Sequence, residues 1–128
     1  MSFKKEYDVI IIGAGPSGVK SALTCSKKGL KVLIIDSNGN SGGQIYRAPP
    51  KSYIKKSKKT LEENLIQIKF SEDLKRNNID TAYNHTVWQV SPGFKIDAFN
   101  ENGTIQWNTK NLIVATGTYE KIIPFDGW

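Results

Sequence analysis

A glycine-rich turn between two short apolar runs constrains the fold more than any other feature of the sequence. The runs are residues 7–12 and 32–35, and a G-x-G-x-x-G pattern begins at Gly13. Apolar runs this short are typical of parallel strands that are buried on both faces of a sheet. Between them, residues 19–28 place apolar side chains at helical spacing, and Gly29 is well placed to end that helix. The segment predicts a strand–turn–helix–strand unit of an α/β fold.

Each glycine of the turn has its own physical role if the turn binds a dinucleotide. Gly13 permits the tight turn out of the strand, Gly15 lets a pyrophosphate approach the backbone, and Gly18 lets the helix pack closely on the sheet. The start of the helix offers unpaired N–H groups and a partial positive charge to the phosphates. We therefore predict these glycines, with the intervening Pro16 and Ser17, as cofactor contacts. A glycine-rich turn that binds no nucleotide is the alternative interpretation.

An acidic residue, Asp36, ends the second apolar run eighteen residues after Gly18. A carboxylate near this offset accepts hydrogen bonds from the ribose of an adenosine. It would repel a 2′-phosphate, and the following Ser37 and Asn38 supply no arginine to hold one. We therefore predict Asp36 and Ser37 as cofactor contacts, and FAD or NAD rather than NADP as the ligand. This unit alone does not distinguish FAD from NAD.

The rest of the chain predicts a loop, a second helix and then a β-rich half. Residues 37–50 are rich in Gly, Asn, Ser and Pro, which is typical of a loop. Apolar side chains recur at helical spacing over about residues 57–77. The strongest hairpin signal is the alternation of apolar residues on either side of Asn102-Gly103. The segments with β-like patterns are residues 81–90, 94–98, 105–107 and 112–115.

These elements predict a single Rossmann-like α/β domain over residues 1–118, followed by a linker-like tail over residues 119–128. Its central sheet is parallel, and an antiparallel hairpin or meander is inserted at about residues 92–110. The chain has 128 residues, of which 38% are hydrophobic and 23% charged, as expected of one globular domain. No apolar run approaches the roughly 20 residues that a membrane-spanning helix needs.

Cysteine usage narrows the chemistry further. The single cysteine, Cys25, allows no intrachain disulfide, zinc cluster or CxxC redox pair, and we expect no metal site. Its position on the first predicted helix indicates a small packing residue. With no signal peptide recognised at the N-terminus, this usage predicts a cytoplasmic protein.

Two later motifs resemble those of a flavoprotein family and favour FAD over NAD as the ligand. Gly42-Gly43-Gln44 follows the acid after a short loop, and Ala115-Thr116-Gly117 closes the last apolar run. Together with the glycine turn they resemble the flavoproteins with two dinucleotide-binding domains, the thioredoxin reductase and glutathione reductase superfamily. In that superfamily the first glycine motif binds FAD, the GGQ-type loop runs along the flavin, and the ATG strand end passes near its phosphates and ring. The resemblance implies that both tripeptides contact FAD.

Longer runs are similar to one branch of that superfamily. GGQIYR, TVW and ATGTYEK, followed by PFDGW, resemble the FAD-binding alpha subunits of hydrogen cyanide synthase, opine oxidases and D-hydroxyproline or proline dehydrogenases. The resemblance implies that Val87 lies by the adenine and that Gln44 to Arg47 line the flavin. It also implies a flavin-dependent dehydrogenase that oxidises a C–N bond in an amino-acid, imino-acid or opine-type substrate and passes electrons to a partner subunit.

The length of the chain leaves several alternatives open. Members of the superfamily continue through a second dinucleotide-binding domain, which we expect to be absent from these 128 residues. A domain without that neighbour exposes apolar surface, which predicts self-association or a partner subunit that supplies the missing domain. The alternatives to an enzyme are a truncated or degenerate, non-catalytic nucleotide-binding module and an NAD-binding Rossmann protein.

No catalytic residue is assigned from the sequence. His85 is the only histidine, and we expect a structural or solvent-facing role for it. Arg47 is an electrostatic candidate near the flavin, where a cation would stabilise the reduced anion, although an ordinary surface arginine fits its position equally well.

The positive charge of the chain does not identify its ligand. The net charge is +6, and five of the lysines lie within residues 51–59. Only Tyr53 interleaves with these lysines, and arginine, which base-reading sites favour, is scarce. We therefore predict a solvated segment here and no nucleic-acid partner.

Overall fold

A computed structural model describes residues 5–46, 58–118 and 124 of the chain. Within that part the chain forms two helices and six strands that belong to one sheet. The helices are α1 (Pro16–Ser26) and α2 (Lys58–Arg76). The strands are β1 (Glu6–Ile12), β2 (Val32–Asp36), β3 (Asp80–Tyr83), β4 (Thr86–Ser91), β5 (Lys95–Asn100) and β6 (Gly103–Val114).

The sheet has a parallel half and an antiparallel half, and its strand order is β3-β2-β1-β6-β5-β4. Strands β1, β2 and β3 pair in parallel, and β6 joins β1 in parallel from Asn108 to Val114. The first part of β6, from Gly103 to Asn108, instead pairs antiparallel with β5, and β5 pairs antiparallel with β4. One long strand therefore connects the two halves, so the predicted meander is confirmed.

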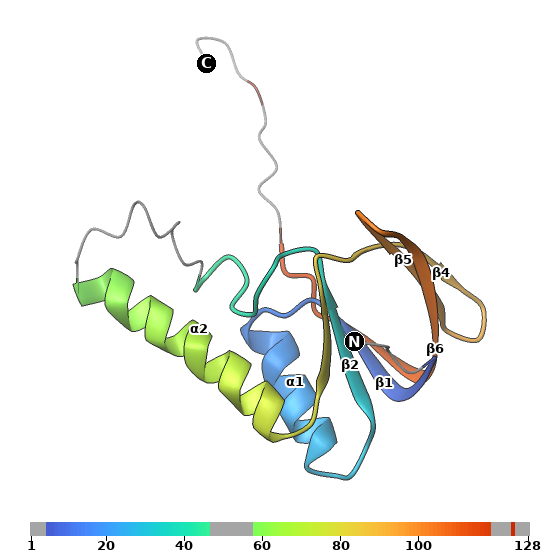
Figure 1. Ribbon diagram of the computed structural model, residues 1–128, viewed down its shortest axis with the longest axis horizontal. Coiled ribbons are helices and arrows are strands. Elements are labelled where there is room, and N and C mark those ends of the chain that lie inside the picture. The colour runs from blue at the N-terminus through green and yellow to red at the C-terminus, as the bar shows by residue number, and fades with distance from the viewer. Residues whose placement is uncertain (1–4, 47–57, 119–123, 125–128) are drawn as a thin grey trace.

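The two faces of the parallel strands are covered by different layers (Figure 1). Both helices lie on one face, where Ile11 and Ile34 form one core cluster with Val19 of α1 and Leu74 of α2. The other face packs against the antiparallel strands, and the largest buried side chain there is Trp107 of β6. The members of this second cluster are Tyr7, Ile10, Leu33, Ile35, Ala82, Ile96, Ala98 and Trp107. Burial on both faces explains why the sequences of the two central parallel strands β1 and β2 are nearly continuous apolar runs.

The structure corrects three of the predicted element boundaries. Helix α1 begins at Pro16, not at residue 19, because proline is suited to the first position of a helix. The β-like residues 81–90 form two strands, since Asn84 adopts a positive φ of 56° and turns the chain between β3 and β4. The apolar segments 105–107 and 112–115 are not separate strands, because β6 runs through both as far as Val114.

The burial of large apolar side chains differs from one segment to another. Trp107 is fully buried, whereas Trp88 on the edge strand β4 is 57% exposed. Leu65 shares the helical spacing of the buried Phe70 and Leu74 of α2 but is itself exposed, so not every apolar residue of that spacing reaches the core. The predicted tail, except for Pro124, and most of the lysine-rich segment lie outside the described residues. Among the described residues, no helix is long and apolar enough to cross a membrane.

Candidate cofactor site

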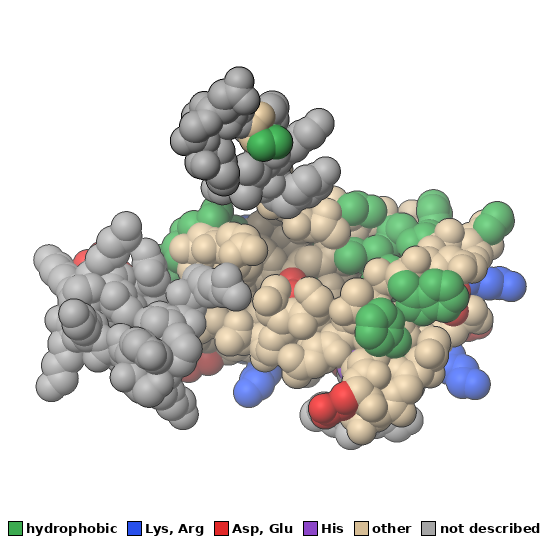
Figure 2. All heavy atoms as spheres, turned by 90° about the horizontal axis from the view of Figure 1, so that it is seen from above, with side chains coloured by type: hydrophobic (Ala, Val, Ile, Leu, Met, Phe, Trp, Pro, Cys, Tyr) green, Lys and Arg blue, Asp and Glu red, His purple; other side chains and the backbone are tan. Residues whose placement is uncertain are grey.

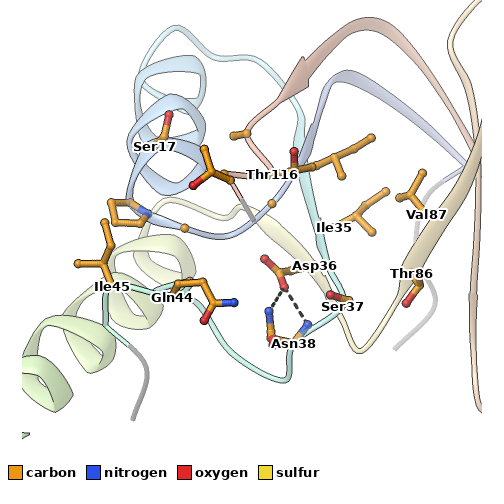
Figure 3. A pocket seen from close by; sticks show the side chains of 18 of the residues that line it. Ser17, Ile35, Asp36, Ser37, Asn38, Gln44, Ile45, Thr86, Val87 and Thr116 are labelled. Carbon is orange, nitrogen blue, oxygen red and sulfur yellow. Dashed lines mark hydrogen bonds between the residues drawn. The ribbon is translucent and has the colours of Figure 1, made fainter. Parts of the chain in front are cut away.

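A cavity of about 690 Å³ opens at the carboxyl ends of β1, β2 and β6. Ligands of open α/β sheets bind at this end, where the strand order changes direction. Figure 3 shows side chains from the glycine turn, the end of β2, the loop after it and the start of β4 facing the same space. The residues that line the cavity are Ile12, Gly13, Gly15, Pro16, Ser17, Ile35, Asp36, Ser37, Asn38, Gly43, Gln44, Ile45, His85, Thr86, Val87, Ala115, Thr116, Gly117 and Thr118.

The first and third glycines of the turn are required by close backbone packing. Gly13 has a φ of 107°, its N–H donates to the Ile35 carbonyl at 2.8 Å, and a Cβ there would lie 2.3 Å from the Ala115 carbonyl oxygen. A Cβ on Gly18 would lie 1.9 Å from the Gly13 carbonyl oxygen. Real Cβ atoms do not approach backbone atoms this closely, so both glycines hold the turn against the sheet.

The second glycine differs, because the space beside it is open. Gly15 has an ordinary φ of −68° and caps α1, and the nearest atom to a Cβ built on it is Gly43 Cα at 4.0 Å. The Gly42 N–H donates to the Ala14 carbonyl at 2.8 Å, which folds the Gly-Gly-Gln loop back over the turn. The turn therefore presents bare backbone and the start of α1 to the cavity, an arrangement that suits a phosphate.

Asp36 is buried and accepts hydrogen bonds from three N–H groups of the chain itself. Its Oδ2 accepts from the Ala14 N–H at 2.5 Å, and its Oδ1 accepts from the Asn38 backbone N–H at 2.8 Å and the Asn38 Nδ2 at 2.9 Å. A carboxylate offers about four acceptor positions, so about one is left for a ligand hydroxyl. Asp36 thus organises the glycine turn in addition to facing the cavity.

The charge around the cavity is small. Among its lining residues Asp36 is the only acidic one, and no lysine or arginine lines it within the described part of the chain. The strand end that carries Ala115 is fixed by a 2.8 Å hydrogen bond from its N–H to the Ile12 carbonyl. Among the described residues, an anionic ligand would therefore meet backbone N–H groups and the positive end of α1.

Most of the sequence-predicted contacts lie together at this cavity. Gly18 and Gly42 lie behind its lining, where they support the turn and the loop, and Arg47 lies outside the described residues. The lining residues that sequence reasoning missed are Ile12, Ile35, Asn38, His85, Thr86 and Thr118. Thr86 was inside a quoted motif and Asn38 followed the acid, but His85 carried no local signal, because its place depends on how β3 and β4 are connected.

Comparisons with known proteins found a matching family profile and several relatives. The sequence profile of the pyridine nucleotide-disulphide oxidoreductase family matches residues 7–128. An opine oxidase subunit of Rhizobium meliloti (strain 1021) is 28% identical over 122 residues, covering 95% of this chain and 27% of that protein. Hydrogen cyanide synthase subunit HcnB of Pseudomonas aeruginosa is 24% identical over 122 residues, covering 93% of this chain and 26% of that protein.

A solved structure shows the same fold. The crystal structure of L-proline dehydrogenase from P. horikoshii aligns with a TM-score of 0.71 at 21% identity, over 92% of this chain and 24% of that one. The chain spans about a quarter of the length of the curated relatives it matches.

Proposed function

The chain belongs to the pyridine nucleotide-disulphide oxidoreductase family and binds FAD, and on this premise we propose that it is the FAD-binding part of an amine-oxidising dehydrogenase. The family membership confirms the resemblance predicted from the sequence, and it favours a flavoprotein over a plain NAD-binding protein. The single observation that supports the proposal best is the cavity, because it gathers the glycine turn, the acid, the Gly-Gly-Gln loop and the Ala-Thr-Gly strand end around one space.

The residues present fit a dinucleotide along the length of the cavity. We assign the pyrophosphate to the open side of Gly15 and the first N–H groups of α1, and the adenosine ribose to Asp36 and Ser37. The adenine is assigned to Val87. The flavin end is assigned to Gln44 and Ala115-Thr116-Gly117, with Gly43 closing the loop over the phosphates and Arg47 as a further candidate.

FAD supplies the redox chemistry when it is bound, by accepting a hydride from the substrate. The chain's own contribution is to orient the cofactor and to keep water from its phosphates. A cofactor bound there would cover the apolar side chains of Ile12, Ile35 and Val87, which line the cavity. Fixed N–H dipoles aimed at an anion cost no reorganisation when it binds, which favours tight binding.

The substrate class and the partner rest on likeness to relatives. The two relatives named above are components of an opine oxidase and of a hydrogen cyanide synthase. We therefore propose an amino-acid, imino-acid or opine-type substrate whose C–N bond is oxidised. Because this chain spans only part of those proteins, we propose turnover for the assembled enzyme. A non-catalytic module would show no turnover.

The surface of the meander supports the proposal of a partner or of self-association. Exposed apolar side chains gather on the side of the molecule formed by the antiparallel strands (Figure 2). On β4, β5 and the turn between them, these residues are Trp88, Val90, Phe94 and Phe99. Apolar surface of this kind is usually covered by another chain or domain. A cytoplasmic location is proposed from the cysteine usage alone.

FAD binding is tested by titrating the purified chain with FAD and, separately, with NAD. We expect quenching of flavin fluorescence and a rise in thermal stability, since a ligand at one hundred times its Kd stabilises the folded state by about 2.7 kcal/mol. Stabilisation by NAD exceeding that by FAD would favour the NAD-binding alternative. An absence of stabilisation by saturating FAD would refute the proposed function.

The substrate class is tested on the assembled enzyme, in which the FAD-loaded chain is combined with the partner that completes it, with a panel of amino acids, imino acids and opines. Bleaching of the flavin absorbance, followed by steady reduction of an artificial dye, is the expected result with at least one of them. FAD binding without bleaching by any member of the panel would favour the non-catalytic module.

A further inference from the structure

His85 occupies the corner where the chain passes from the parallel strands to the meander. It lies between the last residue of β3 and the first residue of β4, it is 9% exposed, and it lines the cavity next to Thr86 and Val87. The function proposed above gives this residue no role. The corner borders the part of the cavity to which the adenosine is assigned above.

The backbone at this corner is tied directly to the residues around the acid. The His85 N–H donates to the Asp36 carbonyl at 3.0 Å, and the Asn84 N–H donates to the Asn38 carbonyl at 3.1 Å. These two bonds continue from the end of β2 into the loop after it. A displacement of the corner would therefore move both the Asp36 segment and the start of β4, which border the same end of the cavity.

The hydrogen bonds of the imidazole require its neutral form. Nδ1 lies 2.7 Å from the Tyr83 carbonyl oxygen, and because a carbonyl only accepts, Nδ1 carries the hydrogen. Nε2 lies 3.0 Å from Nδ2 of Asn100, and because an amide nitrogen only donates, Nε2 must accept with its lone pair. A second proton on the ring would place two N–H donors against each other.

Asn100 cannot relieve that conflict by turning its amide over. Its Oδ1 already accepts the Asn102 N–H at 2.8 Å in the turn between β5 and β6. The imidazole also lies edge-on to the buried Trp107 ring, with centroids 5.7 Å apart and an interplanar angle of 61°. The ring is thus held between β3, β5 and β6 in one orientation.

The hydrogen-bond conflict would weaken FAD binding when the ring is protonated, whereas the charges around the ring would act in the opposite direction. From β2, the Asp36 carboxylate faces the cavity, where it accepts from Ala14 and Asn38. From β3 comes Tyr83, while β5 and β6 contribute the neutral Asn100 and Trp107. A carboxylate and an anionic cofactor both favour a charged imidazole, so through-space attraction alone would tighten FAD binding at acid pH.

We propose that neutral His85, clamped between the Tyr83 carbonyl and Asn100, is a positioning residue that holds the adenosine end of the FAD site in its binding shape. Protonation breaks the Asn100 bond, releases the β3–β4 corner and weakens FAD binding. This inference rests on the proposed function, since it concerns the same site.

The test is the Kd for FAD, measured from about pH 8 down to about pH 5.5. We expect the affinity of the unmodified protein to fall about tenfold towards acid pH, the size of one lost hydrogen bond. In Asn100→Asp the carboxylate accepts from a protonated Nε2, so this fall should disappear. His85→Asn retains a donor for Tyr83 and cannot be protonated, so it should also bind FAD independently of pH.

Circular dichroism at each pH separates weaker binding from unfolding, and Asn100→Asp decides the question if His85→Asn does not fold. Constant or tighter binding at acid pH in the unmodified protein would overturn the inference, and so would an equal fall in Asn100→Asp. Absence of FAD binding at pH 8 would instead count against the proposed function itself.

Discussion

The substitution Gly15→Ala should separate cofactor binding from folding more cleanly than any other change in the glycine turn. Gly15 has an ordinary φ, and the nearest atom to an added Cβ is 4.0 Å away. Alanine restricts the unfolded chain, which stabilises by about 0.4–1 kcal/mol, but it is a poorer helix cap than glycine by a similar amount. The free energy of unfolding should therefore change by less than about 1 kcal/mol.

The same methyl group should strongly weaken FAD binding, because it projects into the cavity where the pyrophosphate is assigned. A pyrophosphate pushed away from the turn loses one or two hydrogen bonds from backbone N–H groups. Each such bond to a charged group contributes about 1.5–3 kcal/mol. A total loss of about 2–4 kcal/mol raises the Kd for FAD roughly 30-fold to 1,000-fold.

Two further glycines supply the controls for this measurement. Gly18→Ala would place its Cβ 1.9 Å from the Gly13 carbonyl oxygen, so it should destabilise the fold by about 3 kcal/mol or more. Gly39 lies outside the cavity lining, but a Cβ there would lie 3.3 Å from the Asn84 side chain at the β3–β4 corner, so Gly39→Ala should raise the Kd far less than Gly15→Ala does. Urea denaturation and FAD fluorescence titration are measured for all three variants. Unchanged FAD affinity in a folded Gly15→Ala protein would refute the assignment of the pyrophosphate to this turn.

Three other substitutions test the site and the core. Asp36→Ala should cost about 3 kcal/mol in urea denaturation and also weaken FAD binding, because it strands the buried Ala14 N–H; a loss below about 1 kcal/mol would contradict this role. Trp107→Ala should lower the free energy of unfolding by about 3–5 kcal/mol, since this fully buried side chain joins the meander to the parallel strands. A smaller decrease in urea denaturation would contradict this role and would show that neighbouring side chains fill the cavity. Burial raises the pKa of the Tyr83 hydroxyl, and the neighbouring Ser41 offsets this only in part. The stability that the neutral hydroxyl contributes is therefore complete below the unfolded pKa of about 10 and is lost as the pH rises through the folded pKa. Tyr83→Phe should therefore flatten the alkaline decline of stability in a pH series of melting temperatures, and an unchanged decline would rule out this group.

The sequence alone predicted the parts of the fold that depend on interactions between residues close together in the chain. The glycine turn needs φ values and backbone contacts that only glycine allows, and the buried parallel strands need continuous apolar runs. Both signals lie within a few residues of the structures they produce. The acid at the end of β2 was predicted for the same reason, since its distance from the turn is set by the length of one helix and one strand.

The three-dimensional structure decided the features that depend on contacts between distant segments. Residues 105–107 and 112–115 belong to one strand because β6 pairs with β5 through its first part and with β1 through its second. His85 reaches the cavity because β3 ends beside the acid and because Asn100, on another strand, fixes the orientation of the ring. Such hydrogen bonds leave no periodicity in the sequence, since they depend on strand order and register, which are fixed only when the whole sheet packs.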